Sequence, residues 1–552
     1  MNRARTTIDQ LSTRHRRAVV ASCITIGVAL AWHFRFVQDD AFISYTYARS
    51  LVEGHGLTWF GSHVEGYTNF LWVMWIALGM RLGIEPVAWA YVGGLASFAG
   101  CVWCLWAISR RMFKELIPAL LSLLFFICNF SVLSYATGGL ETMLQTFLLA
   151  LLFLLATRLT MSKDGSPLDP ALLSLVLAAS LLTRLDSAVI AGVILLFVIR
   201  HLRADRSPAR TYVALLLPAA FILSGWFAWR MSYYGRLLPN TYYAKVGWDA
   251  TSFGNGLLYL WRFLHWYLIW PFLLLGILGL SRSRKKIDQA ITSLMLMVAA
   301  WSLYIIAVGG DFMEFRFIIP MTPFLFLLLA YLVYYHGSNL FFKSQLVAAI
   351  LSMVVLTAAS GYHGSTFKEL TEDKRLDSIE MLSSFYGVYP DHDWKRIGEA
   401  MKEELGGTDA SISTSAVGSI PFYSGLRTVD AIGLCDTNVN DPKAFAPATS
   451  YRPGHGQRVN MSYLKQQRVN FVLDQPVPIV RGVLNRPEVG GMLAAWLVHA
   501  AHRDGPPDSI ETAVAMPLDD RTSLLMMYLT PTAVLDSVIQ TKGWEVARVR
   551  MY

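Results

Sequence analysis

Long apolar runs separated by short polar segments fill the first two thirds of the chain. Roughly eleven of these runs are long enough, or nearly so, to cross the hydrocarbon core of a bilayer as helices. They cover residues 18–34, 87–109, 116–136, 142–159, 168–183, 186–200, 211–229, 256–280, 289–308, 317–336 and 344–361. The pattern therefore predicts a mostly α-helical, polytopic membrane protein.

One further apolar run, residues 67–84, cannot be assigned from hydropathy alone. A run of about eighteen residues either spans a bilayer or lies re-entrant at its surface. If this run does not cross, the basic loop segments all share one side with the basic N-terminus; they contain Arg110, Arg203, Arg284 and Lys343. Because cytoplasmic loops are enriched in Lys and Arg, charge favours a re-entrant segment, a cytoplasmic N-terminus and a C-terminus outside the cytoplasm.

The same topology gathers the unusual polar segments on the outer face. These segments are VQDDAFISYTYARSLVEGHG, TGGLE, TRLDS, SYYGRLLPNTYYAK and GGDFMEFRFIIP. After residue 361 the spanning pattern ends, and charged residues, Pro and Gly return. We therefore expect a transmembrane domain over residues 1–361 and an extracytoplasmic, soluble α/β or β-rich domain over residues 362–552.

The composition agrees with a membrane protein. The 552-residue chain is 54% hydrophobic and only 16% charged, with a mean hydropathy of +0.42, which is too apolar for a soluble protein of this size. Its net charge of +8 lies in short clusters between apolar runs, as membrane topology requires, so nucleic-acid binding is not expected. Four of the five cysteines lie inside apolar runs, and no disulfide framework is expected. The basic residues 1–16 precede an apolar run that is expected to be an uncleaved signal anchor.

Two adjacent carboxylates, Asp39 and Asp40, follow the first apolar run directly. A charge at the end of a span costs little only where it faces water or a protein cavity. Neighbouring carboxylates repel each other, which raises the proton affinity of at least one, and a base that deprotonates a hydroxyl must be held near the membrane surface. A solvated helix end is the alternative. We favour Asp40 as the base.

Other polar side chains lie in the remaining outer segments. Glu141 follows two glycines that permit a tight turn, and it precedes the next apolar run. It is a second acidic candidate, or alternatively a helix-end charge that interacts with the helix dipole. His55, His63 and Glu65 form a mixture able to bind a sugar hydroxyl or to orient a carboxylate, although the two histidines do not have the spacing of a metal motif.

Cations recur in the outer segments near the expected membrane interface; they are Arg184, Arg236, Lys245 and Arg316. A guanidinium pairs bidentately with phosphate, whereas an ammonium acts as a point charge. These residues are candidates for binding a lipid-linked phosphate, and ordinary snorkelling of long side chains at helix ends is the alternative. Tyrosines beside them, Tyr243 included, offer either an interfacial belt or a face for sugar stacking.

Taken in order, these segments resemble a known family. QDDAFISYTYARSLVEGHG, VEGYTNFLW, GGLET, LTRLDS, YYGRLLPNTYYAK and GGDFMEFRFIIP, followed by TSAVGSIPFYSGLRTVDAIGL and RPGH, resemble the bacterial GT-C fold glycosyltransferases of the terminal arabinofuranosyltransferase type. The resemblance covers nearly the whole chain. The DD pair alone is common to many membrane glycosyltransferases, whereas the ordered set is specific to this subgroup. The outer domain is shorter than in the mycobacterial pattern. The identity of the family's acceptor is therefore not carried over to this chain.

The resemblance implies a reaction and a set of partners. The reaction is transfer of a sugar, arabinofuranose in this subgroup, from a polyprenyl-phosphate donor to an acceptor hydroxyl. The acceptor is a cell-envelope glycan or glycoconjugate on the outer side of the bacterial cytoplasmic membrane. We expect catalysis by Asp40, Asp39 and Glu141, donor-phosphate binding by Lys245, Arg316 and Arg236, and substrate contacts from His55, Tyr243 and Asp311. His455, in the conspicuous PGH, is assigned no role beyond acceptor or loop contacts.

Two other classes of function are compatible with many spans. A transporter or flippase of a lipid-linked sugar usually shows inverted repeats and charges near the bilayer midplane. Neither is evident here, and the ionisable residues concentrate in the outer loops. A non-catalytic scaffold that binds envelope glycan would leave the acidic pair without a purpose. No cofactor and no resident metal are expected for the transferase, although carboxylate oxygens could hold a divalent cation.

Overall fold

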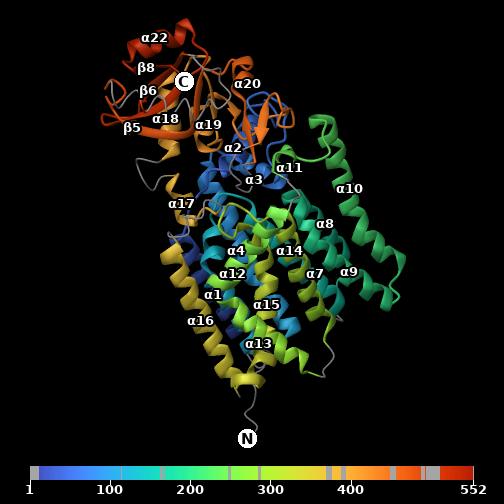
Figure 1. Ribbon diagram of the computed structural model, residues 1–552. Helices are drawn as coiled ribbons and strands as arrows, with labels where there is room; N and C mark the ends of the chain where they lie inside the picture. The colour runs from blue at the N-terminus through green and yellow to red at the C-terminus, as the bar shows by residue number, and fades with distance from the viewer. Residues whose placement is uncertain are drawn as a thin grey trace.

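Figure 1 shows a helical bundle at one end of the molecule and a domain built around a β-sheet at the other. This computed structural model describes residues 12–113, 115–161, 166, 168–245, 250–283, 287–342, 344–367, 376–386, 393–447, 456–486, 492 and 510–550. The helical bundle extends to α16, and the sheet lies entirely C-terminal to it. The mostly helical, membrane-type fold with a C-terminal α/β region is therefore as predicted.

Helices form in every predicted apolar run. The bundle contains α1 (Thr13–His33), α4 (Pro86–Met112), α5 (Leu116–Ile127), α6 (Phe130–Tyr135), α7 (Thr142–Met161), α8 (Asp169–Thr183), α9 (Ala188–Ala204) and α10 (Ala209–Tyr234). It continues with α12 (Ala250–Trp266), α13 (Ile269–Ser281), α14 (Gln289–Val308), η3 (Arg316–Met321), α15 (Thr322–Leu332), η4 (Val333–Phe342) and α16 (Gln345–Thr366). Their buried side chains form one continuous apolar core.

The length and hydropathy of each helix decide whether it can cross a membrane. Among the described residues, seven helices are long and apolar enough to cross a membrane, or eight if α12 and α13, which meet at 90°, count as one broken span. α5 and α8 are shorter apolar helices. The chain is thus a multi-pass membrane protein, and the count of eleven stays a prediction.

The ambiguous apolar run folds as α3 (Phe70–Arg81), next to α2 (Ala41–Val52). Each helix has 12 residues, or about 18 Å at 1.5 Å per residue, which is well short of the roughly 30 Å hydrocarbon core. Figure 1 places both between the bundle and the sheet. This geometry agrees with a segment that lies at the interface rather than one that crosses.

The C-terminal region is an α/β fold around a six-stranded sheet of order β2-β1-β5-β7-β6-β8. Its strands are β1 (Ser411–Thr414), β2 (Arg427–Asp430), β5 (Phe471–Val480), β6 (Ile510–Pro517), β7 (Thr522–Tyr528) and β8 (Glu545–Arg550). Strand β1 runs parallel to β2 and β5, and the other pairings are antiparallel. A separate hairpin joins β3 (Phe445–Pro447) to β4 (Gln457–Val459). The helices of this region are α17 (Ile379–Ser384), α18 (Trp394–Leu405), α19 (Ser419–Ser424), α20 (Met461–Gln466) and α22 (Ala533–Thr541).

The two faces of the sheet pack against different parts of the molecule. Leu524 and Met526 of β7 point into a core shared with α18 and α22. Leu525 and Met527, one residue out of phase, belong to a core that also contains residues of α2 and α3, as the two-residue period of a strand requires. The sheet therefore shares a hydrophobic core with the first loop of the bundle, and the domain boundary drawn at residue 361 stays a prediction.

Candidate active site

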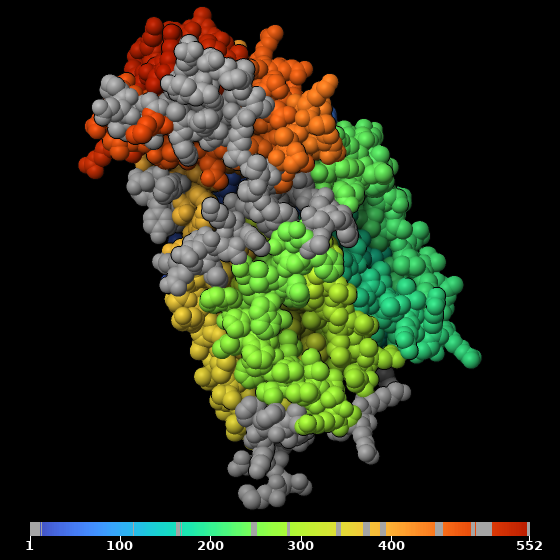
Figure 2. Space-filling view, viewed as in Figure 1, coloured from blue at the N-terminus to red at the C-terminus, as the bar shows by residue number. Residues whose placement is uncertain are grey.

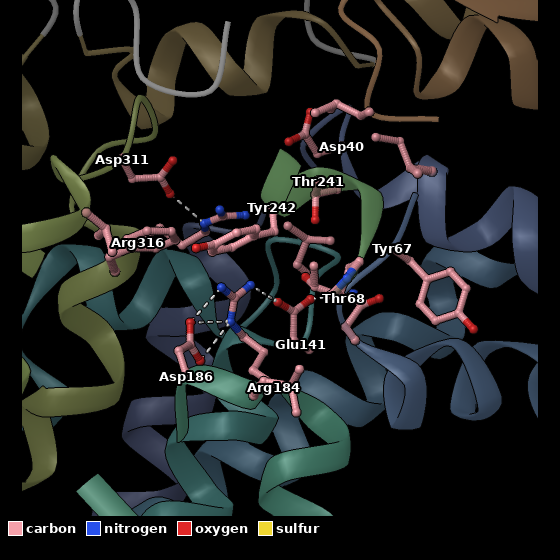
Figure 3. Close-up of a pocket in the computed structure, with 18 of the residues that line it drawn as sticks. Asp40, Tyr67, Thr68, Glu141, Arg184, Asp186, Thr241, Tyr242, Asp311 and Arg316 are labelled. Atoms are coloured by element: carbon pink, nitrogen blue, oxygen red, sulfur yellow. Dashed lines mark hydrogen bonds and ion pairs between the residues drawn. The ribbon is translucent and has the colours of Figure 1, made fainter. Parts of the chain in front are cut away.

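A cavity of about 330 Å³ opens where the bundle meets the sheet region. Its walls come from the α1–α2 turn, the loop before α3, the turn before α7, the α8–α9 turn, the segment around α11 (Asn240–Lys245) and the α14–η3 loop. Leu434 of the sheet region also lines it. The polar segments that the predicted topology placed on one face therefore do meet around one cavity (Figure 3).

One side of the cavity is a hydrogen-bonded cluster centred on Arg184. Its Nη1 donates to Oε1 of Glu141 at 2.8 Å, and its Nη2 donates to Oδ2 of Asp186 at 2.7 Å. Nε also donates to Asp186, at 3.0 Å from Oδ2. Figure 3 shows the guanidinium lying between the two carboxylates. All three nitrogens of the Arg184 guanidinium thus donate hydrogen bonds to carboxylates of the protein.

Neighbouring amide and hydroxyl groups donate further hydrogen bonds to both carboxylates. Asn69 donates from Nδ2 to Oε2 of Glu141 at 2.6 Å, and Ser44 in turn donates to Oδ1 of Asn69 at 3.1 Å. Gln145 donates to Oδ1 of Asp186 at 2.7 Å, and the Tyr304 hydroxyl donates to Oδ2 of Asp186 at 3.2 Å. Glu141 is only 2% exposed. Its burial is matched by a cation and an amide, as a buried carboxylate requires.

The other side of the cavity carries the ion pair of Asp311 and Arg316. Nε of Arg316 donates to Oδ2 of Asp311 at 2.7 Å, and the guanidinium stacks on Phe317 with 5.2 Å from Cζ to the ring centroid. Within the described part of the chain, Nη1 and Nη2 of Arg316 have no hydrogen-bond partner. Arg316 is therefore a preoriented guanidinium with two donor groups available inside the cavity.

A buried contact fixes the loop that carries this ion pair. Glu314 is fully buried, with Oε1 2.8 Å from Nε2 of His363 on α16, and its Oε2 accepts from the Ile379 amide at 2.7 Å. Its backbone amide donates to the Asp377 carbonyl at 3.0 Å. These bonds hold Phe315 at φ +49°, a left-handed conformation that costs a non-glycine residue free energy. The position of Arg316 is thus imposed by tertiary contacts.

Asp40 differs from every other carboxylate in the lining. It lies at the N-terminus of α2 and caps it without a side-chain hydrogen bond. Among the described residues, its carboxylate has no hydrogen-bond or ion-pair partner, whereas Glu141, Asp186 and Asp311 all have one. Figure 3 shows Asp40 on the opposite side of the cavity from Arg184. It is the carboxylate with both oxygens available to a bound molecule.

Asp39 lies outside the cavity lining, in contrast to its neighbour. Its carboxylate accepts hydrogen bonds from the N-terminus of α19 in the sheet region. Burial raises the pKa of Asp39 to about 6, although the hydrogen bonds from Ser419 and Gly418 lower it. The prediction that Asp39 is catalytic together with Asp40 is therefore corrected, because Asp39 does not line the cavity and both of its carboxylate oxygens accept from protein donors.

Several other predicted site residues also lie away from the cavity. His55 is exposed on the loop after α2. Arg236 is committed elsewhere, because Nη1 donates to Oδ1 of Asn240 at 2.7 Å, Nη2 donates to the Thr437 carbonyl, and the guanidinium stacks on Tyr243. Tyr243 thus packs against Arg236, while its neighbour Tyr242 lines the cavity. Lys245 ends α11, and its side chain, like the whole of His455, lies outside the described residues.

Asn240 joins the cavity wall to the sheet region. Its Nδ2 donates to the carbonyls of Gly433, Leu434 and Asp436 at 2.8, 3.0 and 2.8 Å. Its backbone amide donates to the Glu65 carbonyl at 2.9 Å. Asn240 is 1% exposed, so these bonds form away from water. They hold two cavity walls, the segment that carries Tyr242 and the loop that carries Leu434, against each other.

Three of the residues that sequence analysis missed share one property. Asn69, Gln145 and Asn240 act through partners distant in the sequence, and of these only Gln145 gives a local signal, one helical turn after Glu141. Asp186 is different, because it pairs with Arg184 two residues before it. Glu65, assigned to sugar hydroxyls, instead accepts from Nε of the buried Arg230 at 2.6 Å. Among the described residues, no group of three His, Cys, Asp or Glu side chains is arranged to hold a metal ion.

Comparisons with known proteins agree with this architecture. A family profile described as "Domain of unknown function (DUF8728)" matches residues 386–513. The chain is 28% identical over 356 residues to the terminal beta-(1->2)-arabinofuranosyltransferase of Mycobacterium tuberculosis, covering 57% of this chain and 54% of that protein. It is 26% identical over 326 residues to the protein of that name from Corynebacterium glutamicum, covering 52% and 46%. These alignments span about half the length of each curated relative.

The fold as a whole matches a solved structure. It superposes on ArnT from Cupriavidus metallidurans bound to undecaprenyl phosphate with a TM-score of 0.56 and 13% sequence identity, covering 93% of this chain and 98% of that chain. The apo state of ArnT gives a TM-score of 0.52. The predicted resemblance is thereby confirmed: the chain has the GT-C fold and is similar in sequence to terminal arabinofuranosyltransferases.

Proposed function

We propose that this protein is a membrane glycosyltransferase that moves a sugar, arabinofuranose in our proposal, from a polyprenyl-phosphate donor to a hydroxyl of a cell-envelope glycan or glycoconjugate. The sequence relatives named as arabinofuranosyltransferases support transfer over transport. A protein of the same fold binds a polyprenyl phosphate, undecaprenyl phosphate. The acceptor is defined here only by its chemistry, a nucleophilic hydroxyl.

The observation that carries the proposal is the contrast between committed and available groups in the cavity. Among the described residues, Asp40 is a carboxylate without a protein partner, and Arg316 is a guanidinium with two unpaired donor nitrogens. A base and an anion-binding cation are the two groups that transfer from a sugar phosphate requires. Both line one cavity. Of the other charged groups there, Glu141 and Asp186 pair with Arg184, and Asp311 pairs with Nε of Arg316.

The reaction follows from these positions. The acceptor oxygen bonds to the anomeric carbon of the donor sugar, and the acceptor proton passes to a carboxylate oxygen of Asp40. The bond between the anomeric carbon and the phosphate oxygen breaks, and its electron pair goes to the departing polyprenyl phosphate. Donors on Arg316 stabilise that developing negative charge. No nucleotide or redox cofactor is needed, because phosphate at an anomeric carbon is already a leaving group.

The paired cluster contributes an electrostatic environment. Arg184 is shared by two carboxylates, Glu141 and Asp186, so this side of the cavity keeps an excess of negative charge. Glycosyl transfer passes through a state with positive charge on the sugar ring. We infer that Glu141 acts by stabilising that charge and by orienting Asn69, rather than by accepting the acceptor proton. A divalent cation stays a separate prediction, which loss and recovery of transfer with EDTA and Mg²⁺ would test.

We place the cavity at the outer surface of the bacterial cytoplasmic membrane, with the N-terminus in the cytoplasm. The bundle supports a bilayer as partner, because α10 exposes Leu217, Phe221 and Phe227 on a surface that does not pack on the bundle. Figure 1 shows this helix at the edge of the bundle, and Figure 2 shows the same edge in space-filling view. Accessibility of an engineered cysteine in the sheet region to an impermeant thiol reagent in intact spheroplasts tests this orientation.

The identity of the donor can be tested by mass spectrometry of lipids that copurify with the Asp40→Asn protein. The substitution preserves shape but removes the base, so a bound donor is not consumed. We expect a polyprenyl-phosphate pentose in this variant and a smaller amount of it in the wild-type protein. Ordinary phospholipid alone, in both proteins, would contradict a lipid-linked sugar as the donor.

A further inference from the structure

The two adjacent carboxylates of the α1–α2 turn have different surroundings. Oδ2 of Asp39 accepts from the Gly418 amide at 2.9 Å, and Oδ1 accepts from the Ser419 amide at 2.7 Å and the Ser419 hydroxyl at 2.6 Å. These donors lie 379 and 380 positions further along the chain. Asp40 lines the cavity and has no partner among the described residues. One carboxylate is thus bound to the sheet region and the other faces the site.

The contact requires a glycine on the sheet side. A Cβ atom on Gly418 would lie 1.9 Å from the Asp39 carbonyl oxygen and 2.5 Å from its Cγ. No real Cβ atom approaches a backbone oxygen so closely, so the two backbones could not meet if any side chain were present. The requirement that this contact imposes on Gly418 is therefore the lack of space for a Cβ atom.

Aromatic and cationic contacts seat α19 on α2 around this point. The ring of Phe422 lies 5.5 Å from that of Phe42, and Tyr423 is at the same centroid distance from Phe42. Arg49 donates from Nη1 to the Phe422 carbonyl at 2.5 Å and stacks over the Phe422 ring. The Asp39 hydrogen bonds are therefore one part of an extended interface between the first loop and the sheet region.

The backbone transmits this anchoring to Asp40. The Asp39 carbonyl accepts from the Phe42 amide at 2.9 Å, and the Asp40 carbonyl accepts from the Ile43 amide at 3.3 Å. Gln38 is tied to the Gly138 carbonyl on the other side, at 3.4 Å. Since the Asp40 side chain has no hydrogen-bond partner in the part of the chain that the structure describes, the direction of its carboxylate depends on how its backbone is held. Asp39 is the nearest anchored side chain.

We propose that Asp39 is a positioning residue, through which α19 of the sheet region aims Asp40 into the cavity. This inference rests on the proposed function for its kinetic readout, and on geometry alone for its structural readout. It assigns the two residues of the acidic pair to different tasks, the base to Asp40 and its orientation to Asp39. The sheet region then helps to orient the base through α19, in addition to lining the cavity with Leu434.

The structural readout is hydrogen exchange of the Gly418 and Ser419 amides in the full-length protein in nanodiscs. We expect faster exchange at these amides in Asp39→Ala than in the wild type, and no change in the matched variant Asp40→Ala. Exchange in β7 serves as a control for the fold. Unchanged exchange in Asp39→Ala would overturn the proposal whatever the activities are.

The kinetic readout separates orientation from proton transfer. Asp39→Ala and Gly418→Ala should each lower kcat by about 10- to 100-fold, with the KM for the donor within about twofold of wild type. Asp39→Asn keeps one acceptor oxygen, so it should recover part of the rate, whereas Asp40→Asn should not. Ser419→Ala removes only the hydroxyl donor, so it should lower kcat less. The double variant of Ser419→Ala and Asp39→Ala should have the same kcat as Asp39→Ala, because both substitutions remove the same contact.

Two results would contradict the kinetic part. If Asp39→Asn is as inactive as Asp40→Asn while exchange at Gly418 is unchanged, Asp39 acts on the substrate directly. If Asp39→Ala transfers sugar at the wild-type rate, its contact does not position the base. A fully active Asp40→Asn would instead overturn the proposed function, and the exchange measurement would still decide whether Asp39 holds α19.

Discussion

The two sides of the cavity use the same kinds of side chain in opposite ways. On one side, the charged groups form hydrogen bonds with each other and with neighbouring amides; these groups are Arg184, Glu141 and Asp186. On the other side, Asp40 has no protein partner, and Arg316 has only one hydrogen bond within the described part of the chain. Charge alone does not distinguish the sides, since each has carboxylates and a guanidinium.

The difference teaches which groups are available for chemistry. A buried charge whose bonds are all made within the protein stabilises the fold and sets the local field, and breaking such a pair leaves a costly unpaired charge. A charge that is held but not satisfied can bind a ligand. We therefore expect substitutions on the paired side to change stability first, and substitutions on the open side to change activity first.

The largest expected effect is on turnover, from Asp40→Asn. Loss of a general base costs about 10²- to 10⁴-fold in rate. The variant should fold normally, because the Asp40 side chain makes no hydrogen bond with any residue that the structure describes. Transfer from a synthetic polyprenyl-phosphoryl sugar, followed by mass spectrometry, measures the rate. His55→Ala, at an exposed position, is the matched control and should stay within about twofold of wild type.

The next effect is on stability, from Arg184→Gln. The substitution leaves Glu141 and Asp186 facing each other without a cation, and breaking a buried pair costs about 3–5 kcal/mol. The measurement is thermal unfolding in detergent, where the midpoint should fall by several degrees. The double variant Arg184→Gln, Glu141→Gln should recover part of the loss. A midpoint equal to wild type in the single variant would remove the distinction between the two sides.

A smaller effect is expected on donor binding, from Arg316→Gln. Loss of the phosphate contact should raise the KM for the donor by about 10- to 100-fold, since a hydrogen bond to a charged group contributes about 1.5–3 kcal/mol. Asp311→Asn, combined with Arg316→Gln, controls for the unpaired carboxylate that the single variant leaves. If KM for the donor is unchanged while kcat falls, Arg316 does not bind the phosphate in the ground state.

The smallest effect is a dependence of stability on pH, from Asp39. Its pKa of about 6 in the folded protein lies above the ordinary 3.8, so the folded state binds this proton more tightly than the unfolded state. The corresponding stability is fully present below about 3.8 and is lost as pH rises through about 6. Thermal midpoints between pH 4 and 7 should therefore fall with rising pH more steeply in the wild type than in Asp39→Asn. Parallel curves for the two proteins would show that Asp39 does not titrate in this range.

Much of the bundle was predictable because apolar runs in a membrane protein must become helices that satisfy their own backbone. The charge pattern also brought Asp40, Glu141, Asp311 and Arg316 to one end, and all four line the cavity. For these residues the relevant information is local, since each lies in the loop next to an apolar run.

The hydrogen-bond partners could not be predicted in the same way. The acceptors and donors of Asp39 and Gly418 are 379 positions apart, and those of Asn240 and Gly433 are 193 apart. Periodicity and spacing describe only neighbouring turns of the chain, so they gave Asp39 and Asp40 the same environment. Arg236 was misplaced for the same reason, because its carbonyl partner at Thr437 belongs to the sheet region.

One measurement tests the division of the cavity most directly. Asp40→Asn and Arg316→Gln are each incubated with labelled donor and acceptor, and both the donor retained and the polyprenyl phosphate released are quantified. The contrast between base and phosphate contact predicts different results: Asp40→Asn retains donor but releases almost no polyprenyl phosphate, whereas Arg316→Gln retains little donor and, once the donor is saturating, releases polyprenyl phosphate more slowly than the wild type but faster than Asp40→Asn. Release at the wild-type rate by Asp40→Asn, or full retention of donor by Arg316→Gln, would contradict it.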